Sequence, residues 1–226
     1  METVEISKQK PVKSQSMGRE GEEEGGESGL DWEAINEYIV ETEYDADISF
    51  KRVYHDATTI VIFIRHFLCF TAKEYVEDLA KIPKQSLEDK RVRLVIIGCG
   101  ETKFMKRFRR DTGYWAEFYT DRTRELYKLM GCKISPDLGN LAVSKHTKSS
   151  FITGVVRSAI RSTAFPGEHQ GDLEQQGGAF ILGPGEKCHF AHIDRNGSDH
   201  YPINKLLDMV GVPNVRFAKD SGVLTV

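Results

Sequence analysis

The chain has 226 residues, 39% of them hydrophobic, and a formal net charge of -3, which fits one domain of ordinary size with a polar tail. The negative charge argues against a general nucleic-acid-binding protein, and no apolar run reaches the length of a membrane-spanning helix. The four cysteines are too few and too widely spaced for a disulfide-stapled secreted domain or a zinc site, and no apolar leader follows Met1, so we expect a cytoplasmic protein without a nucleic-acid or membrane partner.

The first 30 residues are rich in Gly, Glu and Ser. Such a segment buries too little apolar surface to offset its ordering entropy, so we predict a disordered tail at residues 1–30 and one domain at 31–226. Asp31 is placed to cap a short helix. Residues 48–54 have the composition of a strand.

The next segment, residues 59–79, is expected to hold the reactive site. It opens with a β-branched and aromatic run typical of a strand buried on both faces, and from Phe70 to Leu79 it changes to a helical spacing of apolar residues. Cys69 lies at the junction. The N-terminus of a helix favours an anion, so a cysteine there should ionise more easily than a free thiol, and the thiolate is the reactive form. Pro83 is expected to end this helix.

Further along the chain, strand and helix patterns alternate. Residues 92–98 form a second apolar run, residues 101–110 a basic amphipathic helix, and residues 115–119 a third strand, after which Asp121 caps a helix. This alternation predicts parallel strands with helices on both faces.

The C-terminal part begins with a break in that alternation. We interpret residues 131–176 as an insertion or lid, with a helical piece at 151–165. Two strands, 179–185 and 189–193, then form an antiparallel hairpin around a Gly-Pro-Gly turn, and a last helix covers 203–210. This order of elements is that of the thioredoxin fold, an α/β fold whose central mixed sheet is flanked by helices.

Two sets of motifs closely resemble the peroxiredoxin-like 2 family, whose proteins carry an AhpC/TSA antioxidant-enzyme domain. The first is RHFLC at residues 65–69 with KEYVEDLAKIP at 73–83, and the second includes ILGPG at 181–185, DRN at 194–196 and PIN at 202–204. The resemblance covers about residues 45–226. It implies a thioredoxin-like fold and thiol-redox or antioxidant chemistry.

One feature departs from the family. Its usual motif is C-x-x-C, but Ala72 stands where the second cysteine is expected. Cys69 alone can still be oxidised to a sulfenic acid, which another thiol must then resolve. The candidates are Cys99, Cys132, Cys188 and an external thiol such as glutathione.

Four residues make up the predicted catalytic site: Cys69, Arg65, His66 and Thr71. Arg65 would steady the thiolate, or it pairs with a carboxylate. His66 would act as a base or hydrogen-bond partner, or it is structural, and it occupies the position at which peroxiredoxins carry a Thr or Ser. Thr71 would donate to the sulfur, or it caps the helix. The alternative for Cys69 itself is a buried, inert thiol.

We predict no metal and no cofactor. His189, His192 and His200 with Asp194 suggest a metal cluster, but the spacing of the first two puts them on opposite faces of a strand, which favours structural hydrogen bonds instead. The glycines within 176–178 either let the backbone approach Cys69 or form a plain turn into a strand.

Three functions remain open. The first is a redox protein whose single reactive cysteine reduces a peroxide or disulfide, with a small thiol or a thioredoxin-type protein as reductant. The second is a non-catalytic thioredoxin-fold regulator, linked through the resemblance to growth-kinase signalling and glycolysis and acting through a signalling protein partner. The third is a lipid-endoperoxide reductase, the activity of another branch of the family.

Overall fold

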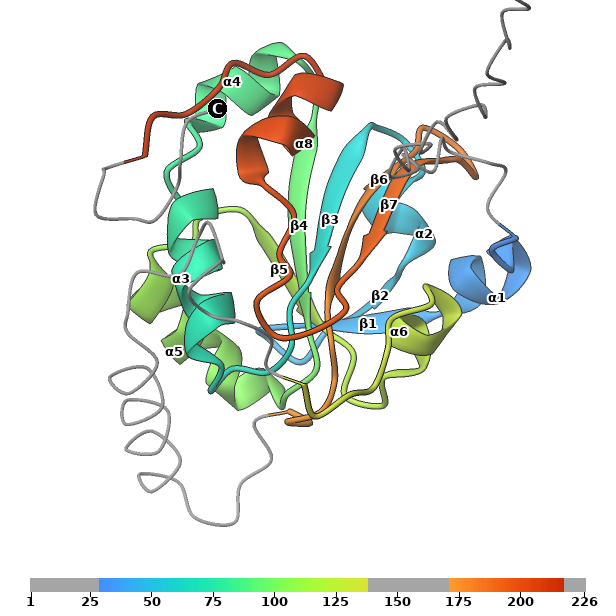
Figure 1. Ribbon diagram of the computed structural model, residues 1–226. Helices are drawn as coiled ribbons and strands as arrows, with labels where there is room; N and C mark the ends of the chain where they lie inside the picture. The colour runs from blue at the N-terminus through green and yellow to red at the C-terminus, as the bar shows by residue number, and fades with distance from the viewer. Residues whose placement is uncertain (1–28, 138–170, 218–226) are drawn as a thin grey trace, which may run out of the picture.

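The computed structural model describes residues 29–137 and 171–217 (Figure 1). The prediction of disorder up to residue 28 and the helical piece at 151–165 therefore lie outside the described residues. Within them, a seven-stranded sheet in the order β2-β1-β5-β4-β3-β6-β7 forms the centre of the domain.

The strands of this sheet are β1 (Ile39–Thr42), β2 (Asp47–Ser49), β3 (Thr59–Phe63), β4 (Arg93–Gly98), β5 (Glu117–Thr120), β6 (Gly178–Leu182) and β7 (Cys188–Ile193). The three central strands β3, β4 and β5 are parallel, and the remaining pairs are antiparallel. The predicted mixed sheet is confirmed. Strand β1 was not predicted.

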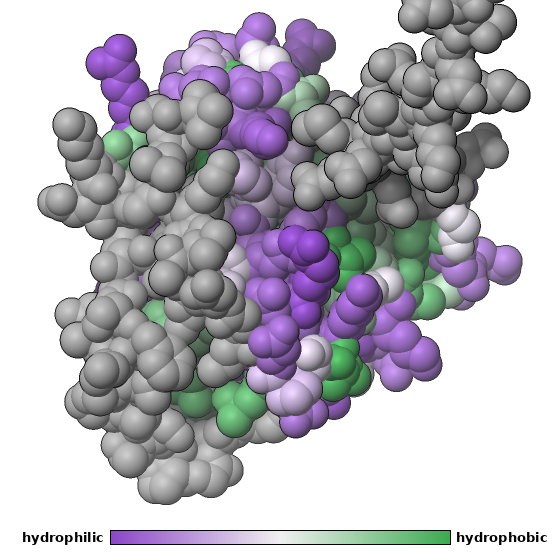
Figure 2. Space-filling model, in the orientation of Figure 1, coloured by the Kyte–Doolittle hydropathy of each residue, from purple (hydrophilic) through white to green (hydrophobic). Residues whose placement is uncertain are grey.

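The helices are α1 (Trp32–Glu37), α2 (Lys51–Tyr54), α3 (Phe70–Leu79), α4 (Lys84–Asp89), α5 (Thr102–Thr112), α6 (Glu125–Leu129) and α8 (Ile203–Met209). They cover both faces of the sheet, with α3, α5 and α8 on one face and α1, α2 and α6 on the other (Figure 1). Among the described residues, no helix combines the length and apolar character that crossing a membrane requires. Hydrophilic side chains gather over α4, at the top of the view in Figure 2.

Strand β3 divides the hydrophobic core into two. Ile60 and Ile62 pack on the α3 side, whereas Val61 and Phe63 pack on the α1 side. All five residues of the strand are buried, as the β-branched run predicts for a strand covered on both faces. The strand is therefore a rigid support for the residues that follow it.

The prediction of a strand over residues 48–54 is wrong beyond Ser49. Phe50, Val53 and Tyr54 are fully buried and lie at i, i+3 and i+4, so one turn of helix, α2, places all three on the same apolar side. The same residues also suit a strand in composition, and only the pattern of burial distinguishes the helical repeat of 3.6 residues from the strand repeat of two.

The ends of three helices test the cap predictions. Asp31 accepts the N–H of Ala34 at 3.1 Å, so the cap of α1 is confirmed. Asp121 holds α6 through its carboxylate, which accepts the N–H of Leu126 at 2.9 Å. Helix α3, by contrast, ends at Leu79, and Pro83 is the N-cap of α4 instead of the end of α3.

The predicted hairpin and final helix are present. Strands β6 and β7 pair antiparallel, with Leu182 opposite Cys188, and Gly183 begins the turn with φ +67°. Because β3 pairs with β6 so that Thr59 faces Leu182, this turn lies at the end of the sheet where β3 begins. The end of β3 that leads to Cys69 is the opposite one.

Candidate functional site

Cys69 lies where β3 gives way to α3, as the sequence predicts. After Phe63 the chain leaves the sheet, and Cys69 is the N-cap of α3 in an extended conformation. The junction is fixed by two backbone hydrogen bonds, from the Cys69 N–H to the His66 carbonyl and from the Lys73 N–H to the Cys69 carbonyl, both 3.0 Å long. The sulfur is therefore held at the positive end of the helix dipole.

Two polar side chains contact the Cys69 sulfur. Arg65 Nη1 donates to Sγ at 3.6 Å, and Thr71 Oγ1 lies 3.0 Å from it. The Thr71 hydroxyl also donates to the Gly197 carbonyl at 2.8 Å. The N-cap residue of α3 is Cys69 and not Thr71, so the predicted contact with the sulfur is present and Thr71 does not occupy the capping position.

The Thr71 hydroxyl has one hydrogen and two neighbours that can accept it. When Cys69 is a thiol, its S–H donates to Thr71 Oγ1 and the hydroxyl donates to Gly197. When Cys69 is a thiolate, the sulfur becomes an acceptor, and the hydroxyl hydrogen must turn from Gly197 to the sulfur to serve it. The charge of the sulfur and the hydrogen bond to Gly197 are thus linked.

Arg65 is a buried cation, with 2% of its surface exposed. Its Nη2 donates to the Leu173 carbonyl at 2.7 Å and its Nε to the Gln175 carbonyl at 3.3 Å. Within residues 29–137 and 171–217 no carboxylate forms an ion pair with it, so the alternative of a carboxylate partner is not observed there. A buried charge is costly without an opposite charge, and the Cys69 sulfur, when ionised, supplies one.

Lys73 follows Cys69 by one helical turn, but it already forms an i,i+4 ion pair with Glu77 at 3.3 Å. Among the described residues, Arg65 is therefore the cation that contacts the sulfur. His66 is buried, and it packs closely against Gly171: a Cβ added to Gly171 would lie 2.7 Å from the His66 Cβ. It touches Cys69 through its backbone carbonyl, and a role for its imidazole stays a prediction.

The remaining cysteines differ in their access to Cys69. Cys99 is fully buried, its thiol donates to the Arg65 carbonyl at 2.7 Å, and burial raises its pKa to about 12. Burial also raises the pKa of Cys132. Cys188 begins β7 at the far end of the sheet, opposite Leu182. All four cysteines are free thiols.

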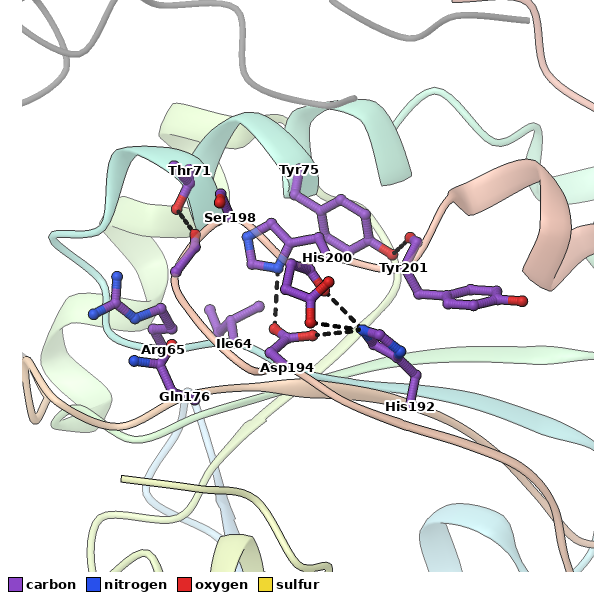
Figure 3. Close-up of polar contacts among 12 residues, drawn as sticks. Ile64, Arg65, Thr71, Tyr75, Gln176, His192, Asp194, Ser198, His200 and Tyr201 are labelled. Carbon is purple, nitrogen blue, oxygen red and sulfur yellow. Dashed lines mark hydrogen bonds and ion pairs between the residues drawn. The ribbon is translucent and has the colours of Figure 1, made fainter. Parts of the chain in front are cut away.

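A loop from Asp194 to Tyr201 packs against α3 beside the cysteine (Figure 3). Asp194 Oδ2 lies 3.1 Å from His200 Nδ1, and His192 Nε2 lies 3.5 Å from Asp194 Oδ1. Among the described residues, no group of His, Cys, Asp and Glu side chains is arranged to hold a metal ion. The predicted structural hydrogen bond between Asp194 and His200 is confirmed.

Gly177 makes room for this loop. A Cβ at this position would lie 2.1 Å from the Phe63 carbonyl and 3.0 Å from Asp194 Oδ2. The close backbone approach predicted for residues 176–178 therefore exists, but it is made to the end of β3 and to Asp194 rather than to Cys69.

Comparison with known proteins identifies the chain's relatives. Peroxiredoxin-like 2C of Bos taurus is 44% identical over 180 residues, which are 79% of each chain, and the Homo sapiens protein of that name is 42% identical over 79% of this chain and 80% of its own. The chain belongs to the peroxiredoxin-like 2 family. The profile of the AhpC/TSA antioxidant enzyme family matches residues 78–196 of the chain. The resemblance predicted from the sequence motifs is therefore confirmed.

More distant similarities agree with this assignment. Prostamide/prostaglandin F synthase of Xenopus tropicalis is 28% identical to this peroxiredoxin-like chain over 166 residues, 73% of this chain and 80% of the synthase. Among solved structures, the bacterioferritin comigratory protein of Xanthomonas campestris, described for alkyl peroxide reduction, matches with a TM-score of 0.50 at 10% identity, over 72% of this chain and 83% of that one. That likeness shows that the chain has the thioredoxin-like fold of the peroxiredoxins.

Proposed function

We propose that this peroxiredoxin-like protein reduces a peroxide or a disulfide with Cys69 as its single reactive thiol. The observation that supports this most is the pair formed by the buried Arg65 guanidinium and the Cys69 sulfur, 3.6 Å apart. Arg65 has no carboxylate partner among the described residues. Its charge and the N-terminus of α3 therefore face the negative charge that the sulfur carries when it attacks as a thiolate, the nucleophilic form of cysteine.

In the first step with a hydroperoxide, the thiolate attacks the terminal oxygen. The S–O bond forms as the O–O bond breaks, the sulfur is oxidised to a sulfenic acid, and the leaving alkoxide takes a proton to become an alcohol. Arg65 Nη1 is placed to stabilise the negative charge that passes from sulfur to oxygen. A disulfide substrate would instead give a mixed disulfide and a released thiolate.

An external thiol, small or carried by a thioredoxin-type protein, would complete the cycle. It condenses with the sulfenic acid to a mixed disulfide and water, and a second thiol then reduces that disulfide. The other cysteines are poorly suited to this step. Burial keeps Cys99 and Cys132 in the neutral form, since their pKa values are raised, and Cys188 lies at the other end of the sheet.

The test is peroxide-dependent oxidation of a thiol reductant by the wild-type protein and by Cys69→Ser. The matched control is Cys188→Ser, which removes a thiol far from the site. We expect Cys69→Ser to lose the activity and Cys188→Ser to keep it. Mass spectrometry of the wild-type protein after mild peroxide should find a sulfenic acid or a mixed disulfide on Cys69.

Equal rates for the wild type and Cys69→Ser would refute the proposal. An unmodified Cys69 after peroxide and after a disulfide would do the same, and it would favour a non-catalytic regulator that acts through a signalling protein partner. Turnover of a lipid endoperoxide but of no hydroperoxide would point to the third function.

A further inference from the structure

The loop beside Cys69 contains a buried carboxylate, Asp194, whose partners are histidines rather than Lys or Arg. The side chain of Asp194 is 3% exposed, and in the described part of the chain no Lys or Arg forms an ion pair with it. Its neighbours are the imidazoles of His200 and His192, of which His200 is closer. Burial raises the pKa of the Asp194 carboxyl, and the hydrogen bond from His200 opposes that rise.

His200 is the better placed of the two imidazoles to share a proton with Asp194. Its side chain is 4% exposed, and its Nδ1 lies 3.1 Å from the carboxylate. An ionised Asp194 accepts a hydrogen bond from the Nδ1–H of His200, and this hydrogen bond leaves Nε2 as the ring nitrogen available to other partners. That nitrogen, Nε2, is buried and has no hydrogen-bond partner within the described part of the chain. A buried, unpartnered ring nitrogen of this kind calls for a ligand or a water molecule.

The free nitrogen faces the side of the loop on which Thr71 lies. The His200 ring stacks on Tyr75 of α3, with centroids 4.7 Å apart. Tyr75 follows Thr71 by one helical turn and shares its face, and Thr71 contacts the Cys69 sulfur and binds Gly197 of the same loop. In Figure 3, the ring nitrogen of His200 that does not bond Asp194 faces the side on which Thr71 and Ser198 lie.

We propose that His200, oriented by Asp194, is the general acid that protonates the leaving oxygen when Cys69 reduces a hydroperoxide. This rests on the proposed function. The thiolate forms the S–O bond, the O–O bond breaks, and the alkoxide receives the proton from His200 Nε2, so the products are a sulfenic acid, an alcohol and a neutral imidazole. The imidazole regains its proton from solvent.

The experiment compares two oxidants whose leaving groups differ in their need for a proton. tert-Butyl hydroperoxide releases an alkoxide, which needs one, whereas peracetic acid releases acetate, which does not. Stopped-flow rates of Cys69 oxidation are measured for the wild type and for His200→Gln. General acids contribute about 10²- to 10⁴-fold. We therefore expect a loss of about 10²-fold or more with the hydroperoxide and a change of less than about threefold with the peracid.

A structural role for His200 would change both rates alike, because a displaced sulfur reacts slowly with either oxidant. The matched control is His192→Gln, which alters the other imidazole beside the same carboxylate and should leave the ratio of the two rates unchanged. Asp194→Asn is a second variant, should His200→Gln not fold. It should show the same selective loss, because the imidazole loses the carboxylate that orients it.

The outcomes separate the two proposals. If the wild type reacts with both oxidants and His200→Gln retains the wild-type ratio of rates, the role of His200 is refuted and the proposed function stands. If Cys69 of the wild type reacts with neither oxidant, peroxide reduction fails, and the role of His200 fails with it.

Discussion

Replacing Arg65 by methionine should slow the reactions of Cys69 strongly. Arg65 Nη1 lies 3.6 Å from the sulfur, and at an effective dielectric constant of about 20 two unit charges at this distance attract each other by roughly 4–5 kcal/mol. Converted at about 1.4 kcal/mol per factor of ten, that energy is an upper limit of about 10³ on the loss of rate. Since solvent and the backbone will adjust in the variant, we expect a loss of about 10- to 100-fold.

The assay is the rate of alkylation of Cys69 by iodoacetamide near neutral pH, followed by mass spectrometry so that only this cysteine is counted. Iodide leaves without a proton, so the rate reports the thiolate itself. Lys73→Met is the matched control, because Lys73 is already paired with Glu77 and its loss should change the rate by less than about threefold. Arg65→Lys keeps the charge and should fall between the wild type and Arg65→Met.

The reasoning is refuted if Arg65→Met, folded as judged by circular dichroism, is alkylated as fast as the wild type. The same holds if Lys73→Met slows the reaction as much as Arg65→Met does. In either case the buried guanidinium would serve only the carbonyls of Leu173 and Gln175. The assignment of Cys69 as the reactive thiol would then lose its main support.

Three further changes have calculable effects. Thr71→Val should lower the free energy of unfolding by about 1–3 kcal/mol in denaturant titrations, because the buried Gly197 carbonyl loses its donor. Gly177→Ala should lower it by more than about 3 kcal/mol, since its Cβ would lie 2.1 Å from the backbone oxygen of Phe63. Cys99→Ser should make the protein less sensitive to alkali, because the raised pKa of Cys99, about 12 against 9.0 unfolded, costs stability as the pH rises from about 9 toward 12, by about 1.4 kcal/mol per pH unit.

Each of these has a clear contrary result. Thr71→Ser, which keeps the hydroxyl, should stay closer to the wild type than Thr71→Val, and the reverse order would contradict the hydrogen bond. Gly113→Ala is the comparison for Gly177, because its Cβ meets nothing within 4 Å although its φ is +69°, so it should cost only about 1 kcal/mol. Wild type and Cys99→Ser unfolding in parallel above pH 9 would mean that Cys99 ionises freely in the folded protein.

The sequence predicted the parts of the fold that depend on neighbouring residues. The buried run at 59–63 and the helical spacing from Phe70 specify a strand followed by a helix, so the place of Cys69 could be found without the structure. Residues 50–54 were misread because a short aromatic and β-branched stretch satisfies either period. Strand β1 was missed, since its four residues, Ile39–Thr42, are recognised by their pairing with β2 and β5.

The partners of the site residues could not be predicted in the same way. Arg65 binds carbonyls 108 and 110 residues away, and Thr71 binds one 126 residues away. A backbone carbonyl has no sequence signature, because every residue has one. The link between Asp194 and His200 could be inferred, since both side chains lie in one short turn. The stacking of His200 on Tyr75 could not.

The single hydrogen of the Thr71 hydroxyl has a consequence for motion. It cannot satisfy the sulfur and the Gly197 carbonyl at once, so forming the thiolate removes one hydrogen bond, worth about 1 kcal/mol, from the loop that packs against Thr71. Local opening of that loop should then be about fivefold more frequent. Amide hydrogen exchange around Gly197 would therefore report the charge on the Cys69 sulfur, and the loop beside the cysteine would loosen when the sulfur becomes able to react.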